Sequence, residues 1–276
     1  MNSWTAVATI PLDGRIQDIA DLSQYDALVI PGGRGAIAYR YDGSYAALSP
    51  QDAPGTHVTT AAEVQSAAEK LNDLINEALA TGKPVLGQCH AAPLVAFARR
   101  DGTTGSGHDG LGISVLAGQH ATGYHLGDGT TAADYATLGI TYLVNEKVVL
   151  DGPKAPHYSG NGRDMLLTSR DWFVETVAYA TKTLDNMLTS YPSPAERTAA
   201  VSVLVFGGDE PAHYLPQEPA RYTDLVALLN DPTDGLNIAA VGTNNPSRHD
   251  PCQPAKLRCS ALFPPRHHFG SGARGD

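Results

Sequence analysis

The chain has 276 residues, of which 42% are hydrophobic and 17% charged, and its formal net charge is −10. This length allows one large α/β domain with an appendage, and the acidic balance argues against a nucleic-acid partner. No apolar run reaches the roughly 20 residues of a membrane-spanning helix, the first residues lack the features of a signal peptide, and three cysteines give no disulfide framework. We therefore expect a globular protein of the reducing cytoplasm with no membrane partner.

The pattern of apolar residues predicts that strands and helices alternate along the chain. Strands are expected at residues 4–10, at 26–31, in the apolar run after Pro84, and at 140–144, 147–150, 165–169, 201–206 and 236–241. Helices are expected at residues 60–80, 93–100, 131–138, 172–188 and 222–230. Short links between such elements are typical of a parallel sheet covered by helices on both faces, whose sites form beyond the carboxyl ends of the strands.

Boundary signals support the long helix in the first third of the chain. Thr60 and Glu63 form a capping-box pattern at its start, and Gly82 is placed to end it. Before this helix, residues 39–60 are rich in Tyr, Gly, Ser and Pro and predict a surface insertion. The helix expected at 172–188 rests on apolar residues at helical spacing, namely Phe173, Val177, Ala180, Leu184 and Leu188.

The turn Gly87–Ala91 is the strongest functional signal. It joins the strand after Pro84 to the helix that contains Pro93, with Cys89 at its apex and His90 beside it. This is the arrangement of a nucleophile elbow, with a thiol in place of the serine hydroxyl. The first N–H groups of the following helix favour a thiolate and are placed to receive an oxyanion.

Plainer interpretations stand beside the functional ones. A small buried cysteine in a core strand is a common state of a thiol, so Cys89 is also compatible with a structural role. The turn Pro31–Gly35 offers N–H groups to an anion, although strand-to-glycine turns are common in α/β proteins. The histidines and cysteines after residue 246 match no zinc-ligand spacing, so no metal site is expected.

Three segments in this order, Tyr25–Gly33, Gly82–His90 and Ala121–Tyr124, resemble the ThiJ/PfpI superfamily of class I glutamine-amidotransferase-like proteins. The resemblance covers about residues 4–190. It implies a flavodoxin-like three-layer sandwich with a mainly parallel sheet. The glycine loop and the Cys-His elbow at this separation are specific together, although neither is specific alone.

The resemblance also implies roles for individual residues. Cys89 would be the nucleophile, and His90 would complete a triad with an acid, as in the branch that contains glyoxalases, chaperones and peptidases. Asp128 lies near the expected position of that acid. The amide of His90 would form an oxyanion hole together with the glycine loop. The residues expected to bind the oxyanion or the substrate are Gly32, Gly33, Arg34 and Tyr124.

The chain departs from the family pattern in two ways. Ala91 stands where the family usually has glycine, a mild change at a position that needs a small side chain. The family also begins with a strand, a loop bearing a glutamate, and a helix; here residues 201–230 resemble that missing start. If this late strand docks beside the strand before Pro31, it completes the sheet. Glu210 then matches the family's glutamate, which hydrogen-bonds the thiolate.

These observations divide the chain into four expected parts. They are a ThiJ/PfpI-like domain at 1–190 without its usual first strand and helix, a linker at 191–200, a strand-helix-strand segment at 201–245, and a disordered tail at 246–276. A circular permutant and a tandem pair cut at both ends both fit this pattern. We favour docking of the late strand, since an unpartnered central strand leaves backbone groups without hydrogen bonds.

The resemblance leaves two classes of function open. In the favoured one, the chain is a cysteine-dependent hydrolase or lyase for small carbonyl compounds, either a cofactor-free glyoxalase or an amidase or peptidase. In the other, it is a non-catalytic stress-response chaperone or a redox sensor whose Cys89 oxidises to a sulfinic acid. No cofactor is expected in either class. The partner would be a small carbonyl compound or a peptide. Because some relatives build sites between subunits, a homodimer is left open.

Overall fold

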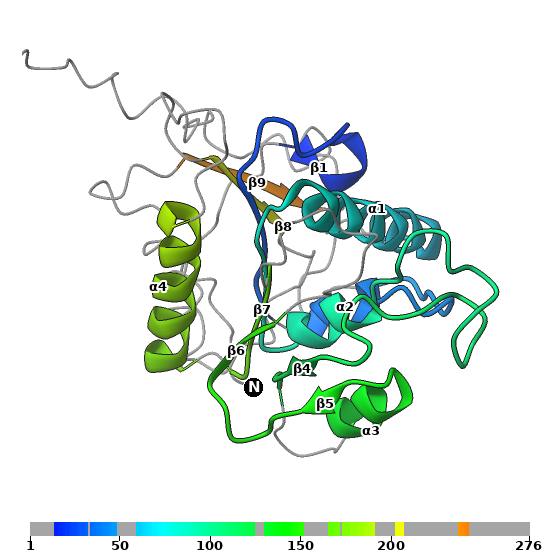
Figure 1. Cartoon of the computed structure of the whole chain (residues 1–276). Coiled ribbons are helices and arrows are strands. Elements are labelled where there is room, and N and C mark those ends of the chain that lie inside the picture. The colour runs from blue at the N-terminus through cyan, green and yellow to red at the C-terminus, as the bar shows by residue number, and fades with distance from the viewer. Residues whose placement is uncertain are drawn as a thin grey trace, which may run out of the picture.

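The computed structural model of the chain shows a mixed α/β protein with a mostly parallel sheet (Figure 1). It describes residues 14–32, 34–48, 59–124, 130–151, 165–171, 173–190, 202–206 and 237–242. The helices are η1 (Ile16–Asp18), η2 (Arg34–Tyr39), α1 (Ala61–Thr81), α2 (Ala91–Phe97), α3 (Thr130–Thr137) and α4 (Val174–Ser190), of which η1 and η2 are 3-10 helices. The strands are β1 (Gly14–Arg15), β2 (Ala27–Ile30), β3 (Val85–Gln88), β4 (His120–Ala121), β5 (Thr141–Tyr142), β6 (Val148–Asp151), β7 (Leu166–Ser169), β8 (Ser202–Phe206) and β9 (Asn237–Gly242).

The main sheet has seven strands in the order β1-β9-β8-β2-β3-β7-β6. Its neighbouring strands are parallel except for β6, which runs antiparallel to β7 at one edge. β4 and β5 form a separate parallel pair. Among the described residues, no helix is both long enough and apolar enough to cross a membrane.

Strand β8 is an interior strand of this sheet, although it comes late in the chain. It pairs in parallel with β2, with Leu204 opposite Leu28, and its other side pairs with β9. The strand expected at residues 201–206 therefore docks beside the strand that precedes Pro31, which confirms its predicted place. Leu204 is fully buried there, and burial of its side chain stabilises the folded protein by about 1.5–3 kcal/mol.

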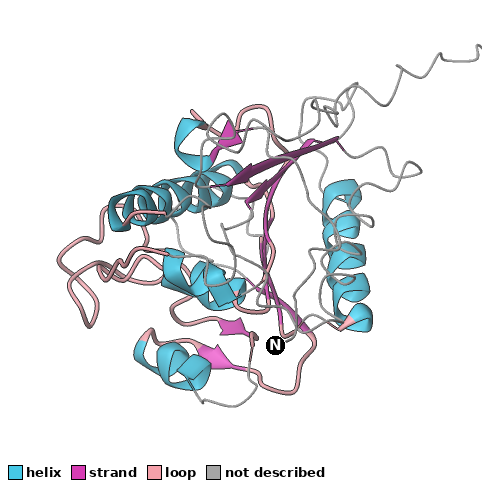
Figure 2. Ribbon diagram, turned by 180° about the vertical axis from the view of Figure 1, so that it is seen from behind, coloured by secondary structure: helices cyan, strands magenta, loops and turns pink. Residues whose placement is uncertain are grey.

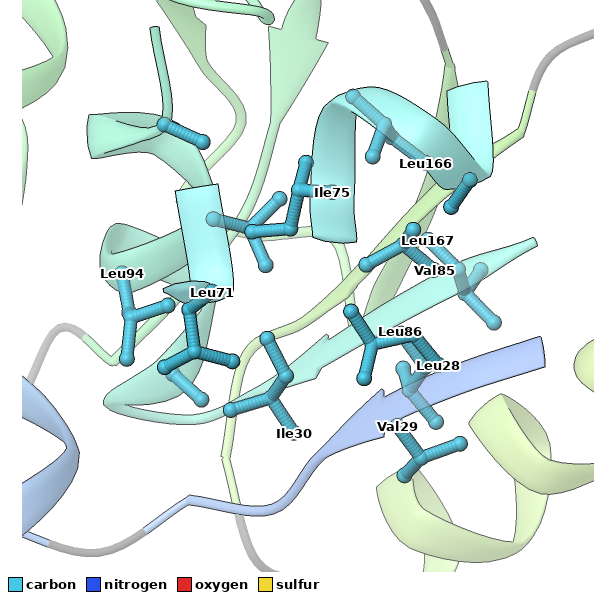
Figure 3. Close-up of a cluster of buried hydrophobic side chains, with 14 of the residues drawn as sticks. Leu28, Val29, Ile30, Leu71, Ile75, Val85, Leu86, Leu94, Leu166 and Leu167 are labelled. Carbon is cyan, nitrogen blue, oxygen red and sulfur yellow. The ribbon is translucent and has the colours of Figure 1, made fainter. Parts of the chain in front are cut away.

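Helices cover both faces of the sheet. Helices α1 and α2 lie on one side and α4 on the other (Figures 1 and 2). Apolar side chains from α1, α2 and the strands β2, β3 and β7 gather in one cluster (Figure 3). The β2 and β3 strands are buried along their whole length. This explains why β2 is a continuous apolar run and why β3 is apolar up to Gln88, rather than alternating.

Helix α1 begins and ends as the sequence predicts. The Thr60 side chain accepts a hydrogen bond from the Glu63 N–H, and the Glu63 carboxylate accepts one from the Thr60 N–H, so the capping box is complete. At the other end, Gly82 adopts the left-handed conformation with φ of 71°. This glycine ends the helix because it takes that conformation without a Cβ clash.

Helix α2 is shorter than expected, because it ends at Phe97 and not near Arg100. Two asparagines of α1 hold the next turn of chain: Asn72 Oδ1 accepts from the Arg99 N–H, and Asn76 Nδ2 donates to the Arg99 carbonyl, both at 2.7 Å. Because the Arg99 N–H and carbonyl already bond to α1, they do not form the backbone hydrogen bonds that would extend α2. The Arg99 side chain is 3% exposed and pairs with Asp109, so it does not cap a helix end.

Several other expectations change in detail. Helix α4 begins at Val174, two residues later than predicted, and Phe173 precedes it and is 45% exposed, so Phe173 does not belong to the helix. The remaining four apolar positions of that helix are buried. The strand predicted at 140–144 is only two residues long, as β5. The predicted strand at 4–10, the helix at 222–230, the linker and the tail all lie outside the described residues.

Candidate active site at the Cys89 turn

Cys89 lies between β3 and α2 in a strained backbone conformation. Its φ is +55°, and it is the one non-glycine residue of the described chain with positive φ. Its N–H donates to the Ser169 carbonyl at 2.9 Å, and its carbonyl accepts from the N–H groups of Ala92 and Tyr124, each at 3.2 Å. A left-handed cysteine costs on the order of 1–3 kcal/mol. These three bonds hold it in place, as a nucleophile elbow requires.

Small residues allow the strand and helix to meet at this turn. A Cβ on Gly87 would lie 2.7 Å from Val95 Cγ2 and 2.8 Å from the Ala91 carbonyl oxygen. Gly87 is therefore needed for the close approach of α2 to β3. Ala91 is fully buried at the first position of α2, so the turn accommodates its methyl group where the resemblance led us to expect glycine.

The Cys89 thiol and the His90 imidazole are in contact. Cys89 Sγ lies 3.4 Å from His90 Nδ1, within hydrogen-bonding distance for sulfur. Cys89 is 2% exposed and His90 is 9% exposed. Neighbouring residues in the chain can place their side chains together here because the elbow turns the backbone sharply between them. An imidazole at this distance is able to take the thiol proton.

Tyr124 lies against the same imidazole. Its ring centroid is 3.8 Å from that of His90, and the two ring planes are tilted by 31°. The sequence predicted that Tyr124 belongs to the site, and the structure places it beside His90. The Tyr124 ring therefore contacts His90, the residue that would accept the thiol proton.

Gly32, in the loop after β2, packs directly onto the cysteine. A Cβ on Gly32 would lie 2.5 Å from Cys89 Cβ and 2.7 Å from the Gln88 carbonyl oxygen. No side chain fits between these backbones, so the glycine is needed for the loop to approach. The start of the predicted oxyanion loop and the elbow thus meet at the carboxyl ends of adjacent parallel strands.

Two tyrosines support the segment that leads to Tyr124. The Tyr135 hydroxyl donates to the Thr122 carbonyl at 2.9 Å, and the Tyr142 hydroxyl donates to the Gly123 carbonyl at 3.2 Å. Burial raises the pKa of Tyr135 well above its ordinary value and raises the pKa of Tyr142 to about 12. Both hydroxyls therefore keep their protons, and remain donors, at neutral pH.

Four of the eight predicted site residues come together, namely Cys89, His90, Gly32 and Tyr124. Arg34 begins η2 just beyond the glycine loop. Gly33, Asp128 and Glu210 lie outside the described residues. Phe206 ends β8 at the same edge of the sheet where β2 and β3 end, because the three strands are parallel.

Sequence reasoning missed the residues that hold the turn from the neighbouring strand. The Ser169 carbonyl accepts from the Cys89 N–H, and Thr168 Oγ1 accepts from the Thr122 N–H at 3.0 Å. Both belong to β7, which is fully buried. Thr168 acts through its hydroxyl, so a threonine in a buried apolar strand was an available signal. Ser169 acts through its backbone carbonyl, which no residue type marks in the sequence.

Comparison of the chain with protein-family models, curated proteins and solved structures found no match.

Proposed function

We propose that the chain is a cysteine-dependent enzyme of the ThiJ/PfpI type that acts on small carbonyl compounds. The observation that carries the proposal is the Cys89 turn, in which a strained cysteine at a strand-to-helix turn has its sulfur 3.4 Å from His90 Nδ1. A core cysteine with a purely structural role needs neither the positive φ nor the adjacent imidazole. Strain of this kind is typical of functional sites.

The strand order supports a flavodoxin-like sandwich for this proposal. Apart from the two-residue edge strand β1, the parallel strands lie in the order β9-β8-β2-β3-β7. When the strands are numbered from β8 as the first, followed by β9, β2, β3 and β7, this is the flavodoxin order 2-1-3-4-5. The chain would then be a circular permutant of that fold. Ligands of flavodoxin-like proteins bind where the strand order reverses, which is here between β8 and β2, next to the Gly32 loop and Cys89.

The proposed reaction with a 2-oxoaldehyde uses water as its only co-reactant. The His90 imidazole takes the thiol proton, and the Cys89 sulfur adds to the aldehyde carbon to give a hemithioacetal. The histidine then moves the proton from C1 to C2, which converts the hemithioacetal into the thioester of a 2-hydroxy acid. Water hydrolyses the thioester and regenerates the thiol, so methylglyoxal would yield lactate. Backbone N–H groups at the Gly32 loop and at His90 would bind the developing oxyanion.

Two carboxylates would complete the proposed site. Glu210 follows β8 by four residues, and β8 ends at the edge of the sheet that carries Gly32 and Cys89. Asp128 follows Tyr124, whose ring contacts His90. We propose Glu210 as the partner of the thiol and Asp128 as the partner of the imidazole, following the resemblance.

The test is loss of methylglyoxal and formation of lactate, followed by proton NMR in buffer without glutathione or another free thiol. The wild-type chain should convert methylglyoxal. Cys89→Ser should reduce the rate at least a hundredfold, since a serine hydroxyl is a much weaker nucleophile at neutral pH. Cys252→Ser, the same substitution at a cysteine of the C-terminal region, is the matched control and should keep the wild-type rate.

Two results would count against the enzyme. If the wild-type chain and Cys89→Ser consume methylglyoxal at the same rate, the proposed conversion to lactate through Cys89 is ruled out. If a panel of small amides and esters is also turned over equally by both chains, the cysteine has no catalytic role, and the non-catalytic alternative takes its place.

A further inference from the structure

The segment Thr122–Tyr124 is bonded at almost every backbone group to residues outside it. Thr168 binds its Thr122 N–H, and the Tyr135 and Tyr142 hydroxyls bind the carbonyls of Thr122 and Gly123. At its end, the Tyr124 carbonyl accepts a hydrogen bond from Thr131 Oγ1 at 2.5 Å. Bonds from β7, α3 and β5 leave this segment little freedom to move.

The segment also has no room to change its path. A Cβ on Gly123 would lie 3.0 Å from the Tyr135 hydroxyl oxygen and 3.2 Å from both Ala92 Cβ and Pro93 Cδ. Gly123 therefore lies tightly between α2 and α3. Helix α2 begins at the residue after His90, so the same helix that positions the imidazole also packs against the segment.

Tyr124 contacts both catalytic candidates. Its N–H donates to the Cys89 carbonyl at 3.2 Å, and its ring stacks on the His90 imidazole at 3.8 Å between centroids. The rigid segment thus fixes one aromatic face against the imidazole, while His90 Nδ1 lies 3.4 Å from the sulfur. The Tyr124 ring therefore limits the rotation of the imidazole.

We propose that Tyr124 is a positioning residue, whose ring holds the His90 imidazole toward Cys89 and favours its protonated form. The face of a tyrosine ring is electron-rich and attracts a cation. When the imidazole takes the thiol proton, it becomes such a cation beside the tyrosine ring. Tyr124 therefore favours the thiolate–imidazolium pair over the neutral pair. This role rests on the proposed function of the Cys89 turn.

The test measures the reactivity of the Cys89 thiol and does not depend on catalytic turnover. The rate of Cys89 alkylation by iodoacetamide is followed from pH 5 to pH 9 by mass spectrometry of the Cys89 peptide, which separates it from Cys252 and Cys259. Tyr124→Phe keeps the aromatic face and should stay within about twofold of wild type. Tyr124→Leu removes it and should slow alkylation at pH 7 by about threefold to tenfold, with its pH midpoint moved upward. Tyr179→Leu, at a tyrosine that is 56% exposed, is the matched control and should not change the rate.

A shape-preserving variant covers the case in which Tyr124→Leu does not fold. Pentafluorophenylalanine at position 124 fills the same space but has an electron-poor face, so it should slow alkylation as the leucine variant does. The proposal is overturned if either variant reacts like wild type while folded, or if Tyr124→Phe loses as much as Tyr124→Leu. Lactate formation by the same variants is measured separately. If the wild-type chain makes no lactate but Tyr124→Leu still slows alkylation, the reaction fails and the positioning role stands.

Discussion

The backbone at Cys89 carries a cost that the rest of the turn has to offset. Its φ of +55° is a conformation that glycine adopts freely and that a residue with a Cβ adopts with strain. The bonds to Ser169, Ala92 and Tyr124 hold the residue there. If the conformation serves the chemistry, stability and reactivity oppose each other at this one position.

Cys89→Gly and Cys89→Ala test this strain directly. Both variants remove the thiol, but only glycine relieves the left-handed conformation. We expect Cys89→Gly to be more stable than Cys89→Ala by about 1 kcal/mol, measured as the difference in free energy of unfolding in urea. A glycine variant that is less stable than the alanine variant would contradict the positive φ.

A second residue-scale prediction concerns Gly32. Its missing side chain allows the loop to lie on Cys89, because an added Cβ would approach Cys89 Cβ to 2.5 Å. Gly32→Ala should destabilise the protein by about 1–3 kcal/mol and should slow alkylation of Cys89, because the loop has to move away. Gly14→Ala is the matched control, since nothing lies within 4 Å of a Cβ there. Equal stability of the two variants would show that the loop does not press on the elbow.

The sequence could identify the site only as far as local patterns reach. The Cys-His turn and the glycine loop are visible as motifs, and both lie where the sequence placed them. The stacking of Tyr124 on His90 depends on where α2 and α3 pack, which no local pattern encodes. The same is true of the bond between Ser169 and Cys89, since it joins the turn after β3 to the end of β7, about eighty residues further along the chain.

At the scale of elements, the hydroxyl of Tyr142 links β5 to the segment beside the site. Its pKa is raised to about 12, mainly by burial, and it donates to the Gly123 carbonyl. The folded protein therefore holds this proton more tightly than the unfolded chain, in which tyrosine titrates near pH 10. The stability that depends on the neutral hydroxyl is complete below about pH 10 and is lost as the pH rises toward about 12.

We accordingly expect the free energy of unfolding to fall between pH 9.5 and about 11.5, and to fall less steeply in Tyr142→Phe. Tyr135 and Tyr45 also have raised pKa values, so this variant should remove only part of the slope. Urea unfolding at several pH values in this range measures it. Tyr179→Phe, at an exposed tyrosine, is the control and should retain the wild-type slope. Identical slopes in both variants would contradict the role of Tyr142.

The boundaries of elements were predictable where local chemistry sets them and not where tertiary contacts do. Helix α1 is bounded by its own Thr60–Glu63 capping box and by Gly82, and both ends agree with the sequence. Helix α2 ends early because Asn72 and Asn76 of α1 bind the backbone of Arg99. Those asparagines lie more than twenty residues away in the chain, so the helical pattern through Arg100 gave no sign of them.

At the scale of the whole molecule, the sheet depends on a strand that lies about 170 residues from its neighbour in sequence. The place of β8 was predictable because β2 reads as a buried central strand, and such a strand needs partners on both sides. The register was not predictable, since both strands are continuous apolar runs and several alignments bury them equally well. The structure fixes it with Leu204 opposite Leu28.

This dependence predicts the effect of shortening the chain. A chain that ends at Ser190 lacks β8 and β9, so Ala27, Leu28 and Val29 lose their partners on one side and the apolar strand β2 becomes an edge strand. Exposed edges of this kind pair with other molecules. We expect this chain to aggregate and to lose cooperative unfolding, measured by light scattering after size exclusion and by circular dichroism during urea unfolding.

A chain that ends at Gly242 is the control, because it retains all the strands that the structure describes, and it should remain soluble and unfold cooperatively. Co-expression of residues 191–242 as a separate chain should restore solubility to the chain that ends at Ser190, because the pairing of β8 with β2 needs no covalent link. A soluble and cooperative chain 1–190 on its own would show that β2 does not need β8. In that case the proposed permutation would lose its physical basis, because the late strand would add nothing that the first 190 residues lack.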